Sequence, residues 1–376
     1  MIDKMKKTRR IAVVGAGAVG SYYGGRLWEG AANLRRSDDD IPTTVSFHLR
    51  GENYDYCIQQ GIHISSYHGD FHIPAEKLSA YRTTEDMARA VLSDEEDGED
   101  YDWIICALKS TSLHEIPTLI EPLLSRKTRL LVIMNGFVED DLINMMRKRH
   151  RETTGLDGLG CQTIYGGMAL ICSNRTSPGR ISHSYGGKLV CGVAYSANAE
   201  REAGGDDGNG GWVESDKHAI EDLFQLASPA VPFEFEPCLR RGRWWKGVWN
   251  LPFSGIAVSM GGITVDRIVN DPGLRKLAYK VMDETIAIAN ADLRKHGCTD
   301  DELLGEQTKE EMMTLSDNMG PYQVSTMLDM HARKPMEVKY IFRTAIDRAN
   351  ALGVSCPHLE SLVWHIEAHQ RYHNLY

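Results

Sequence analysis

The sequence has 376 residues, 42% of them hydrophobic and 25% charged, and a formal net charge of −10 at pH 7. This composition is typical of a globular protein, and the length favours two domains because one hydrophobic core rarely organises so many residues. The acidic balance argues against nucleic acid as the main partner. No segment offers the roughly 20 apolar residues that cross a bilayer, so no membrane partner is expected.

Cysteine usage and the first residues favour a cytoplasmic protein. The eight cysteines include no Cys-x-x-Cys pair, and in a chain of this size they are expected to be reduced thiols. Residues 1–10 are basic but precede only four apolar residues, so we interpret them as a leader before the first strand and not as a secretory signal.

A glycine-rich turn follows the first predicted strand, residues 11–14. It consists of Gly15, Ala16, Gly17, Ala18, Val19 and Gly20, in the pattern Gly-x-Gly-x-x-Gly. The first glycine permits a sharp turn, the second leaves room for a pyrophosphate, and the third lets the next helix approach the strand. Amides at the helix N-terminus then face the phosphate. Strand, turn and helix together predict a dinucleotide site.

Arg50 bears on the choice of cofactor. Residues 45–50 alternate apolar and polar side chains and predict a second strand that ends at Arg50. At this position an acidic residue binds the ribose hydroxyls of NAD, whereas arginine pairs with the 2′-phosphate of NADP. Arg50 therefore favours NADP(H). The alternative is a ribose bound by the acidic run 38–40, although adjacent acids in a loop are more often hydrated.

Two further strands end in polar residues. Residues 102–109 and 128–135 have apolar middles, as expected in a parallel sheet that is covered on both faces. Ligands of such a sheet lie beyond the carboxyl ends of its strands. Lys109 and Asn135 are therefore candidates to contact cofactor or substrate, although either residue alone is more often part of a loop.

The rest of the first half is predicted to contain a hairpin, more strands and three surface insertions. Residues 61–74 suit the hairpin, and residues 165–173 and 180–193 suit strands, the second interrupted by a turn at Gly186 and Gly187. The insertions are residues 30–44, 93–100 and 198–211.

Helical periodicity dominates from residue 240 onward. Asp271 and Pro272 open one long helix that Gly297 ends, and residues 335–353 predict another. We place the domain boundary near Pro237, which gives domains 1–237 and 238–376.

Lys246, Asn250 and Ser254 recur at intervals of four, so they share one face if this segment is helical. A cation, an amide and a hydroxyl among tryptophans suit recognition of an oxygen-rich small molecule. The alternative is an amphipathic helix whose polar side faces water.

His365, His369 and His373 have the same spacing. They lack cysteine ligands at metal spacing and a His-Glu-x-x-His motif, so no metal is expected.

Taken together, several motifs resemble the ketopantoate reductase (2-dehydropantoate 2-reductase) family. They are the glycine turn, Arg50, Ala107-Leu-Lys109, Asn135-Gly136, Pro178-Gly-Arg-Ile-Ser-His183, Lys246-x-x-x-Asn250, and Ser325-Thr326-Met327-Leu328 followed by Glu337. The likeness runs in order over most of the chain and departs at the three insertions.

The resemblance implies an α/β Rossmann domain with a doubly wound, mainly parallel sheet, followed by an all-α domain. It also implies NADPH-dependent reduction of a 2-oxo acid in the cleft between them. The default reaction is ketopantoate to pantoate, a step of pantothenate biosynthesis.

The resemblance also implies roles for single residues. Lys246 would be the general acid, Asn250 would bind substrate, and Glu337 would support the catalytic site and the cofactor. Lys109 and Asn135 would contact cofactor and substrate.

Two substrate-binding positions differ from the family: Thr326 replaces the usual serine, and Ser254 replaces a second asparagine. The segment between Thr326 and Glu337 is also one residue shorter, and these departures bear on the substrate more than on the reaction.

The implied chemistry is physically consistent. Hydride attack on a ketone builds alkoxide charge, which a nearby ammonium stabilises and protonates. The ordinary lysine pKa of ~10.4 must be lowered for this task, and burial would lower it. Glu337, expected two residues into a helix, would keep Lys246 charged. The alternative is that Glu337 is a plain helix-start acid.

Two other functions are compatible with the sequence: a β-hydroxyacid dehydrogenase, and a redox sensor that binds NADPH without turnover. The presence of both Lys246 and Asn250 argues against the sensor, which needs no proton donor. Neither the substrate side chain nor the oligomeric state follows from the sequence, which leaves a homodimer open.

Overall fold

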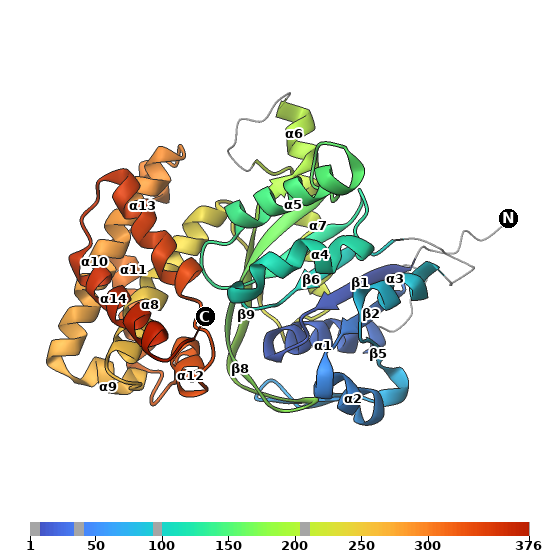
Figure 1. Ribbon diagram of the computed structural model, residues 1–376, viewed down its shortest axis with the longest axis horizontal. Coiled ribbons are helices and arrows are strands. Elements are labelled where there is room, and N and C mark those ends of the chain that lie inside the picture. The colour runs from blue at the N-terminus through green and yellow to red at the C-terminus, as the bar shows by residue number, and fades with distance from the viewer. Residues whose placement is uncertain (1–7, 34–40, 93–99, 204–210, 376) are drawn as a thin grey trace. The chain divides into compact units, whose positions relative to one another are not determined.

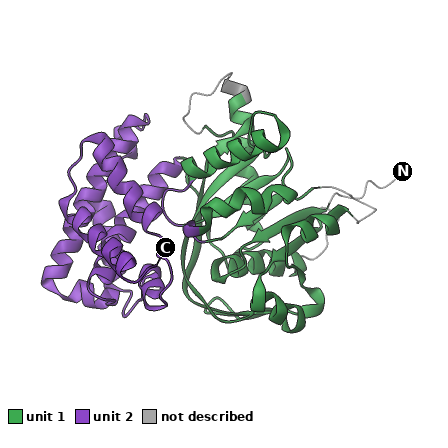
Figure 2. Ribbon diagram, viewed as in Figure 1, with its two compact units in different colours: residues 1–108, 112–134, 139–237 green, residues 109–111, 135–138, 238–376 purple. Residues whose placement is uncertain are grey.

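The computed structural model describes residues 8–33, 41–92, 100–203 and 211–375. The chain divides into two compact units, coloured separately in Figure 2. Unit 1 comprises residues 1–108, 112–134 and 139–237, and unit 2 comprises residues 109–111, 135–138 and 238–376. Two short segments that follow strands of unit 1 therefore belong to unit 2. Within the described residues, no helix is long and apolar enough to cross a membrane.

The described part of unit 1 is built on a ten-stranded sheet with the order β4-β3-β9-β8-β7-β6-β1-β2-β5, and β10 pairs with β9 (Figure 1). Six neighbouring strands, from β8 to β5, run parallel. Strand β9 is antiparallel to β8, and both β3 and β10 run parallel to β9. The strands are β1 (Arg9–Val14), β2 (Thr43–His48), β3 (Ile62–Ser66), β4 (Phe71–Ile73), β5 (Ser79–Tyr81), β6 (Trp103–Cys106), β7 (Arg129–Ile133), β8 (Thr163–Ser177), β9 (Arg180–Ser196) and β10 (Phe233–Phe235).

The central strands β1, β6 and β7 are almost fully buried, which explains their continuous apolar runs. This arrangement confirms the predicted α/β class with a mainly parallel sheet, and β3 with β4 forms the predicted hairpin. The helices of unit 1 are α1 (Ala18–Asn33), α2 (Gly51–Gln60), α3 (Thr84–Leu92), α4 (Ile116–Ile120), α5 (Glu139–Thr154), α6 (Ala197–Ala203) and α7 (Glu214–Gln225).

Two predicted insertions are shorter than expected. Helix α1 continues to Asn33, and Gly30 packs against the end of α7, where a Cβ would lie 1.8 Å from the Leu226 carbonyl oxygen. Helix α6 occupies the start of the third insertion. Residues 34–40, 93–99 and 204–210, which include the acidic run 38–40, lie outside the described residues.

The predicted turn at Gly186 and Gly187 is wrong. Strand β9 runs through both glycines, and the pairing with β8 shifts register there instead of reversing direction. Both residues have positive φ, at 74° and 116°. Glycine adopts such angles readily, so it suits this irregular segment of the strand.

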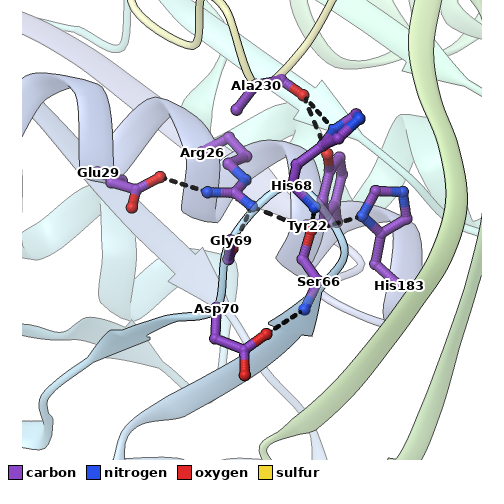
Figure 3. Close-up of polar contacts among 9 residues, drawn as sticks. All are labelled: Tyr22, Arg26, Glu29, Ser66, His68, Gly69, Asp70, His183 and Ala230. Carbon is purple, nitrogen blue, oxygen red and sulfur yellow. Dashed lines mark hydrogen bonds and ion pairs between the residues drawn. The ribbon is translucent and has the colours of Figure 1, made fainter.

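A buried polar network fastens α1 to β3 and β9, as Figure 3 shows. Arg26 donates to the Ser66 hydroxyl at 3.1 Å and to the Gly69 carbonyl at 2.7 Å. The Ser66 hydroxyl lies 2.8 Å from Nδ1 of His183, whose Nε2 lies 3.2 Å from the carbonyls of Tyr185 and Gly186. Burial lowers the pKa of His183 to about 4, so the ring is neutral near pH 7.

The described part of unit 2 is helical, which confirms the predicted all-α region. Helix α8 is its centre, because side chains from all around this helix are buried. Asp271 caps α10 by accepting bonds from the amides of Gly273 and Leu274. The elements are α8 (Leu239–Ser259), α9 (Val265–Asn270), α10 (Pro272–Lys295), α11 (Glu306–Asp317), α12 (Ser325–His331), the π-helical turn η5 (Lys339–Arg343), α13 (Thr344–Leu352) and α14 (Pro357–Tyr372).

Candidate functional site

The glycine turn in unit 1 joins β1 to α1 and is closely packed at two of its glycines. Gly15 has φ of 84°, and a Cβ there would lie 2.6 Å from Leu108 Cδ2. A Cβ on Gly20 would lie 2.5 Å from the Gly15 carbonyl oxygen. At Gly17, by contrast, the nearest neighbour of an added Cβ is that same oxygen, 4.0 Å away. The turn therefore has tight ends and bare, open backbone in its middle, which suits the approach of a phosphate.

Arg50 follows β2 and precedes α2 as its N-cap residue. The end of β2 lies beside the glycine turn, since the Ala16 amide donates to the His48 carbonyl at 3.5 Å. The Arg50 side chain is 55% exposed and forms an ion pair with Glu115 at 3.2 Å. A hydrogen bond from Ser112 and the nearby Arg50 charge lower the pKa of Glu115 against the effect of its burial. Arg50 is thus an exposed cation near the turn.

In unit 2, Lys246, Asn135 and Glu337 form a continuous polar chain. Lys246 Nζ donates to Asn135 Oδ1 at 2.9 Å, and Asn135 Nδ2 lies 3.4 Å from Glu337 Oε2. The other Glu337 oxygen accepts two bonds from Ser110, one from its amide and one from its hydroxyl, both at 2.8 Å. Segments that are far apart in the sequence therefore converge on one buried carboxylate.

Lys246 has a strongly perturbed environment. Although the residue keeps partial exposure, burial of its ammonium is the largest influence, and with the Arg243 charge it lowers the pKa of Lys246 to about 7. The Glu337 carboxylate acts in the opposite direction. The lowering by burial agrees with the direction expected from the sequence, and it lets Lys246 exchange a proton near neutral pH.

Glu337 occupies a different local structure from the predicted one. The helix does not start at Pro335: Val338 is the first helical residue, so Glu337 precedes it. The Met336 amide donates to the Gln370 side chain at 2.7 Å. From its place just before the helix, the Glu337 side chain accepts the bonds of Ser110 and Asn135.

Sequence reasoning missed Ser110 and Asp329. Lys109 forms an ion pair with Asp329, whose pKa is raised by burial against the effect of the lysine charge. Ser110 directly follows Lys109, so two adjacent polar residues after β6 were a usable signal. Asp329 lies between Leu328 and Met330 in α12 and carries no comparable signal.

The remaining predicted residues lie on helices of unit 2. Asn250 and Ser254 follow Lys246 by one and two turns on α8, which is helical as expected and contains Pro252. Ser254 is 4% exposed, and Thr326, on α12, is 2% exposed. The predicted positions thus divide into the glycine turn and Arg50 in unit 1, and Lys109, Asn135, Lys246, Asn250, Ser254, Thr326 and Glu337 in unit 2.

The three spaced histidines lie on α14 or directly after it. Among the described residues, no group of three His, Cys, Asp or Glu side chains is arranged to hold a metal ion.

Comparison with known proteins identifies the family. Residues 11–195 match the family model described as ketopantoate reductase PanE/ApbA, and residues 239–370 match the model of its C-terminal region. A 2-dehydropantoate 2-reductase of Nostoc sp. is 27% identical over 94% of this chain and 93% of its own length.

Solved structures agree with that assignment. A 2-dehydropantoate 2-reductase of Geobacter metallireducens has a TM-score of 0.75 and 27% identity, with 96% of this chain and 99% of that one covered. A D-mandelate dehydrogenase, solved with NADH and anilino(oxo)acetate, shares the fold at a TM-score of 0.71 and 16% identity, with 98% and 100% covered. The chain therefore belongs to the ketopantoate reductase PanE/ApbA family of oxidoreductases.

Proposed function

We propose that this protein reduces a 2-oxo acid to a 2-hydroxy acid with NADPH, with ketopantoate as the default substrate. The observation that carries the proposal is the contact of Lys246 Nζ with Asn135 Oδ1 at 2.9 Å, together with a Lys246 pKa of about 7. A lysine with this pKa is protonated in part of the population at neutral pH and gives up its proton readily. In this proposal unit 1 is the NADP(H)-binding domain, unit 2 is the substrate and catalytic domain, and the enzyme acts in the cytoplasm.

The residues present fit the cofactor. The open backbone at Gly17 leaves room for a pyrophosphate, and the exposed Arg50 guanidinium suits a 2′-phosphate. Lys109, Asn135 and Glu337 would complete the contacts. When bound, NADPH supplies a hydride to the substrate carbonyl.

The side chains of unit 2 would perform the proton chemistry. Lys246 stabilises the alkoxide that forms on reduction and then protonates it from Nζ. Asn135 accepts a bond from Lys246 and so orients the ammonium, while Glu337 favours its charged form. Asn250, Ser254 and Thr326 would bind the carboxylate and hydroxyl groups of the substrate.

Loss of NADPH absorbance with ketopantoate, a series of larger 2-oxo acids and several 3-oxo acids tests this function. The reverse reaction with 3-hydroxy acids and NADP⁺ gives a further comparison. We expect turnover with at least one 2-oxo acid, and a rate lower by at least about a hundredfold in Lys246→Ala at the same enzyme concentration. Turnover only with 3-oxo or 3-hydroxy acids would identify a β-hydroxyacid dehydrogenase. NADPH binding without turnover of any compound would identify a sensor.

A further inference from the structure

Lys246 and Asn135 lie 111 positions apart in the sequence, and one hydrogen bond joins their side chains. A lysine side chain has four rotatable bonds, and the hydrogen bond to Asn135 forms only while the two backbones that carry these side chains keep their separation. Something else must fix the backbone of α8 relative to the segment that follows β7.

Four residues of unit 2 form a closed ring of contacts at this place, here called the Arg348 clamp: Phe137, Trp244, Asp292 and Arg348. Asp292 Oδ2 accepts bonds from Trp244 Nε1 at 2.7 Å and from Arg348 Nη1 at 2.8 Å. The guanidinium carbon of Arg348 lies 4.3 Å from the centre of the Phe137 ring. The Phe137 and Trp244 rings, 4.5 Å apart, close the circuit.

The clamp is built for rigidity. Trp244 is fully buried, Asp292 is 3% exposed and Phe137 is 7% exposed. Burial alone would raise the pKa of Asp292, but the Arg348 charge and the Trp244 hydrogen bond lower it, so the carboxylate stays charged. A planar guanidinium that donates from its edge to a carboxylate and also lies over an aromatic ring is held in one orientation, which a flexible ammonium would not be.

Two residues of the clamp lie close in sequence to the hydrogen-bonded pair. Phe137 is two residues after Asn135, and Trp244 is two residues before Lys246. The clamp therefore grips both chain segments that carry the hydrogen-bonded pair. We infer that the Arg348 clamp positions Lys246 against Asn135 and thereby sets the geometry of proton donation.

This inference rests on the proposed function for its catalytic consequence, although the positioning itself does not. The alternative is that the clamp only stabilises the helical unit. Arg240 provides a matched control, because its Nη1 lies 3.3 Å from the same Asp292 oxygen while it is Arg348 that covers the Phe137 ring. Replacement of either arginine removes a cation from Asp292, and only the replacement of Arg348 opens the clamp.

The experiment compares wild type, Arg348→Met, Arg348→Lys and Arg240→Gln. For each we would measure Tm, kcat and KM for the 2-oxo acid with the highest turnover. The reactivity of Lys246 is measured separately, by competitive acetylation with acetic anhydride over a pH series and peptide mass spectrometry. This second readout requires neither substrate nor turnover.

We expect Arg348→Met to lower kcat by at least about tenfold with KM changed far less, since small displacements of a catalytic group are costly. The pH midpoint of Lys246 acetylation should rise by about one unit or more as water reaches the ammonium. Arg348→Lys should fall between wild type and Arg348→Met. Arg240→Gln should keep kcat within about twofold and leave the midpoint unchanged.

Equal kcat and equal acetylation midpoints in wild type and both Arg348 variants would overturn the clamp, as would equal losses in Arg348→Met and Arg240→Gln. If Arg348→Met does not fold, Arg348→Lys against Arg240→Gln decides the matter by the same criteria. If wild type reduces no 2-oxo acid but the midpoint still rises in the Arg348 variants, the positioning stands and the proposed function fails.

Discussion

Each unit contains a buried polar network in which burial lowers the pKa of a basic side chain, but the two pKa values differ in their relation to neutral pH. Around His183 in unit 1, burial lowers the histidine pKa to about 4, and both ring nitrogens have partners in Ser66 and in backbone carbonyls. Around Lys246 in unit 2, burial lowers the lysine pKa to about 7. The shift moves the pKa of His183 away from neutral pH and moves the pKa of Lys246 toward it.

The difference lies in what surrounds each group. The His183 ring contacts Ser66, which in turn accepts a bond from Arg26 of helix α1 (Figure 3). With a pKa of about 4, the ring stays neutral at pH 7. In the Lys246 network the Glu337 carboxylate opposes the effect of burial on the lysine pKa, whereas the neighbouring His68 and Arg26 act in the same direction as burial on the His183 pKa. A group whose pKa lies far from neutral pH keeps one protonation state and suits a structural role, whereas a group with a pKa near 7 suits proton transfer.

The largest effect should follow from Lys246→Ala, which removes the poised group. General acid catalysis is typically worth roughly 10²–10⁴-fold, so we expect kcat to fall by at least about a hundredfold. NADPH affinity, which we attribute to the glycine turn and Arg50, should stay within a few-fold. Steady-state kinetics and fluorescence titration with NADPH measure the two quantities. Survival of kcat would mean that another group supplies the proton.

Arg50→Ala tests whether the exposed cation of unit 1 contributes to cofactor binding, in contrast to the buried Lys246 of unit 2, which we expect to act in turnover. A charge-assisted contact with a phosphate at a partly exposed site is worth about 1–3 kcal/mol, so NADPH binding should weaken about ten- to a hundredfold. NADH binding should change little, because NADH lacks the 2′-phosphate. Titrations of both cofactors give the answer, and an equal loss for both would place Arg50 away from the phosphate.

Much of this organisation was predictable from the sequence, and the failures have physical causes. Apolar runs in the sequence predicted the buried strands β6 and β7, and helical periodicity predicted that Lys246 and Asn250 share one face. Gly186 was misleading because glycine suits both a turn and an irregular strand, and only the pairing of β9 with β8 distinguishes them.

Residues that act through tertiary contacts were beyond sequence reasoning. The ion pair of Lys109 with Asp329 joins positions 220 residues apart, and local periodicity carries no information about such a pairing. Asp292 and Arg348 carry no signal in the sequence, and only the structure shows that Arg348 donates to the buried Asp292 carboxylate and lies over the Phe137 ring.

The stability of the protein should depend on pH through His183. Its pKa is about 4 in the folded protein and about 6.5 in an unfolded chain, so the unfolded state binds more protons between these values. The free energy of unfolding should therefore fall as pH decreases from 6.5 to 4, by at most about 3 kcal/mol from this group. Urea unfolding at a series of pH values measures it. In His183→Asn, which keeps an acceptor for Ser66, this part of the pH dependence should disappear, and an unchanged slope would assign it to other groups.

The smallest expected effect concerns substrate size and Ser254. Ser254 stands on α8 two turns after Lys246. Because the resemblance to the family implies an asparagine at this position, the shorter serine side chain would leave more volume beside the proposed substrate. One methylene of apolar fit is worth about 1–3 kcal/mol in a pocket, so the enzyme should accept 2-oxo acids bulkier than ketopantoate. Ser254→Asn should then lower kcat/KM for the bulkier acids several-fold while ketopantoate is spared. Thr326→Ser is the matched control, because it alters the second departure from the family without filling this volume. If ketopantoate exceeds every larger 2-oxo acid in kcat/KM for the wild type, the extra volume does not select the substrate.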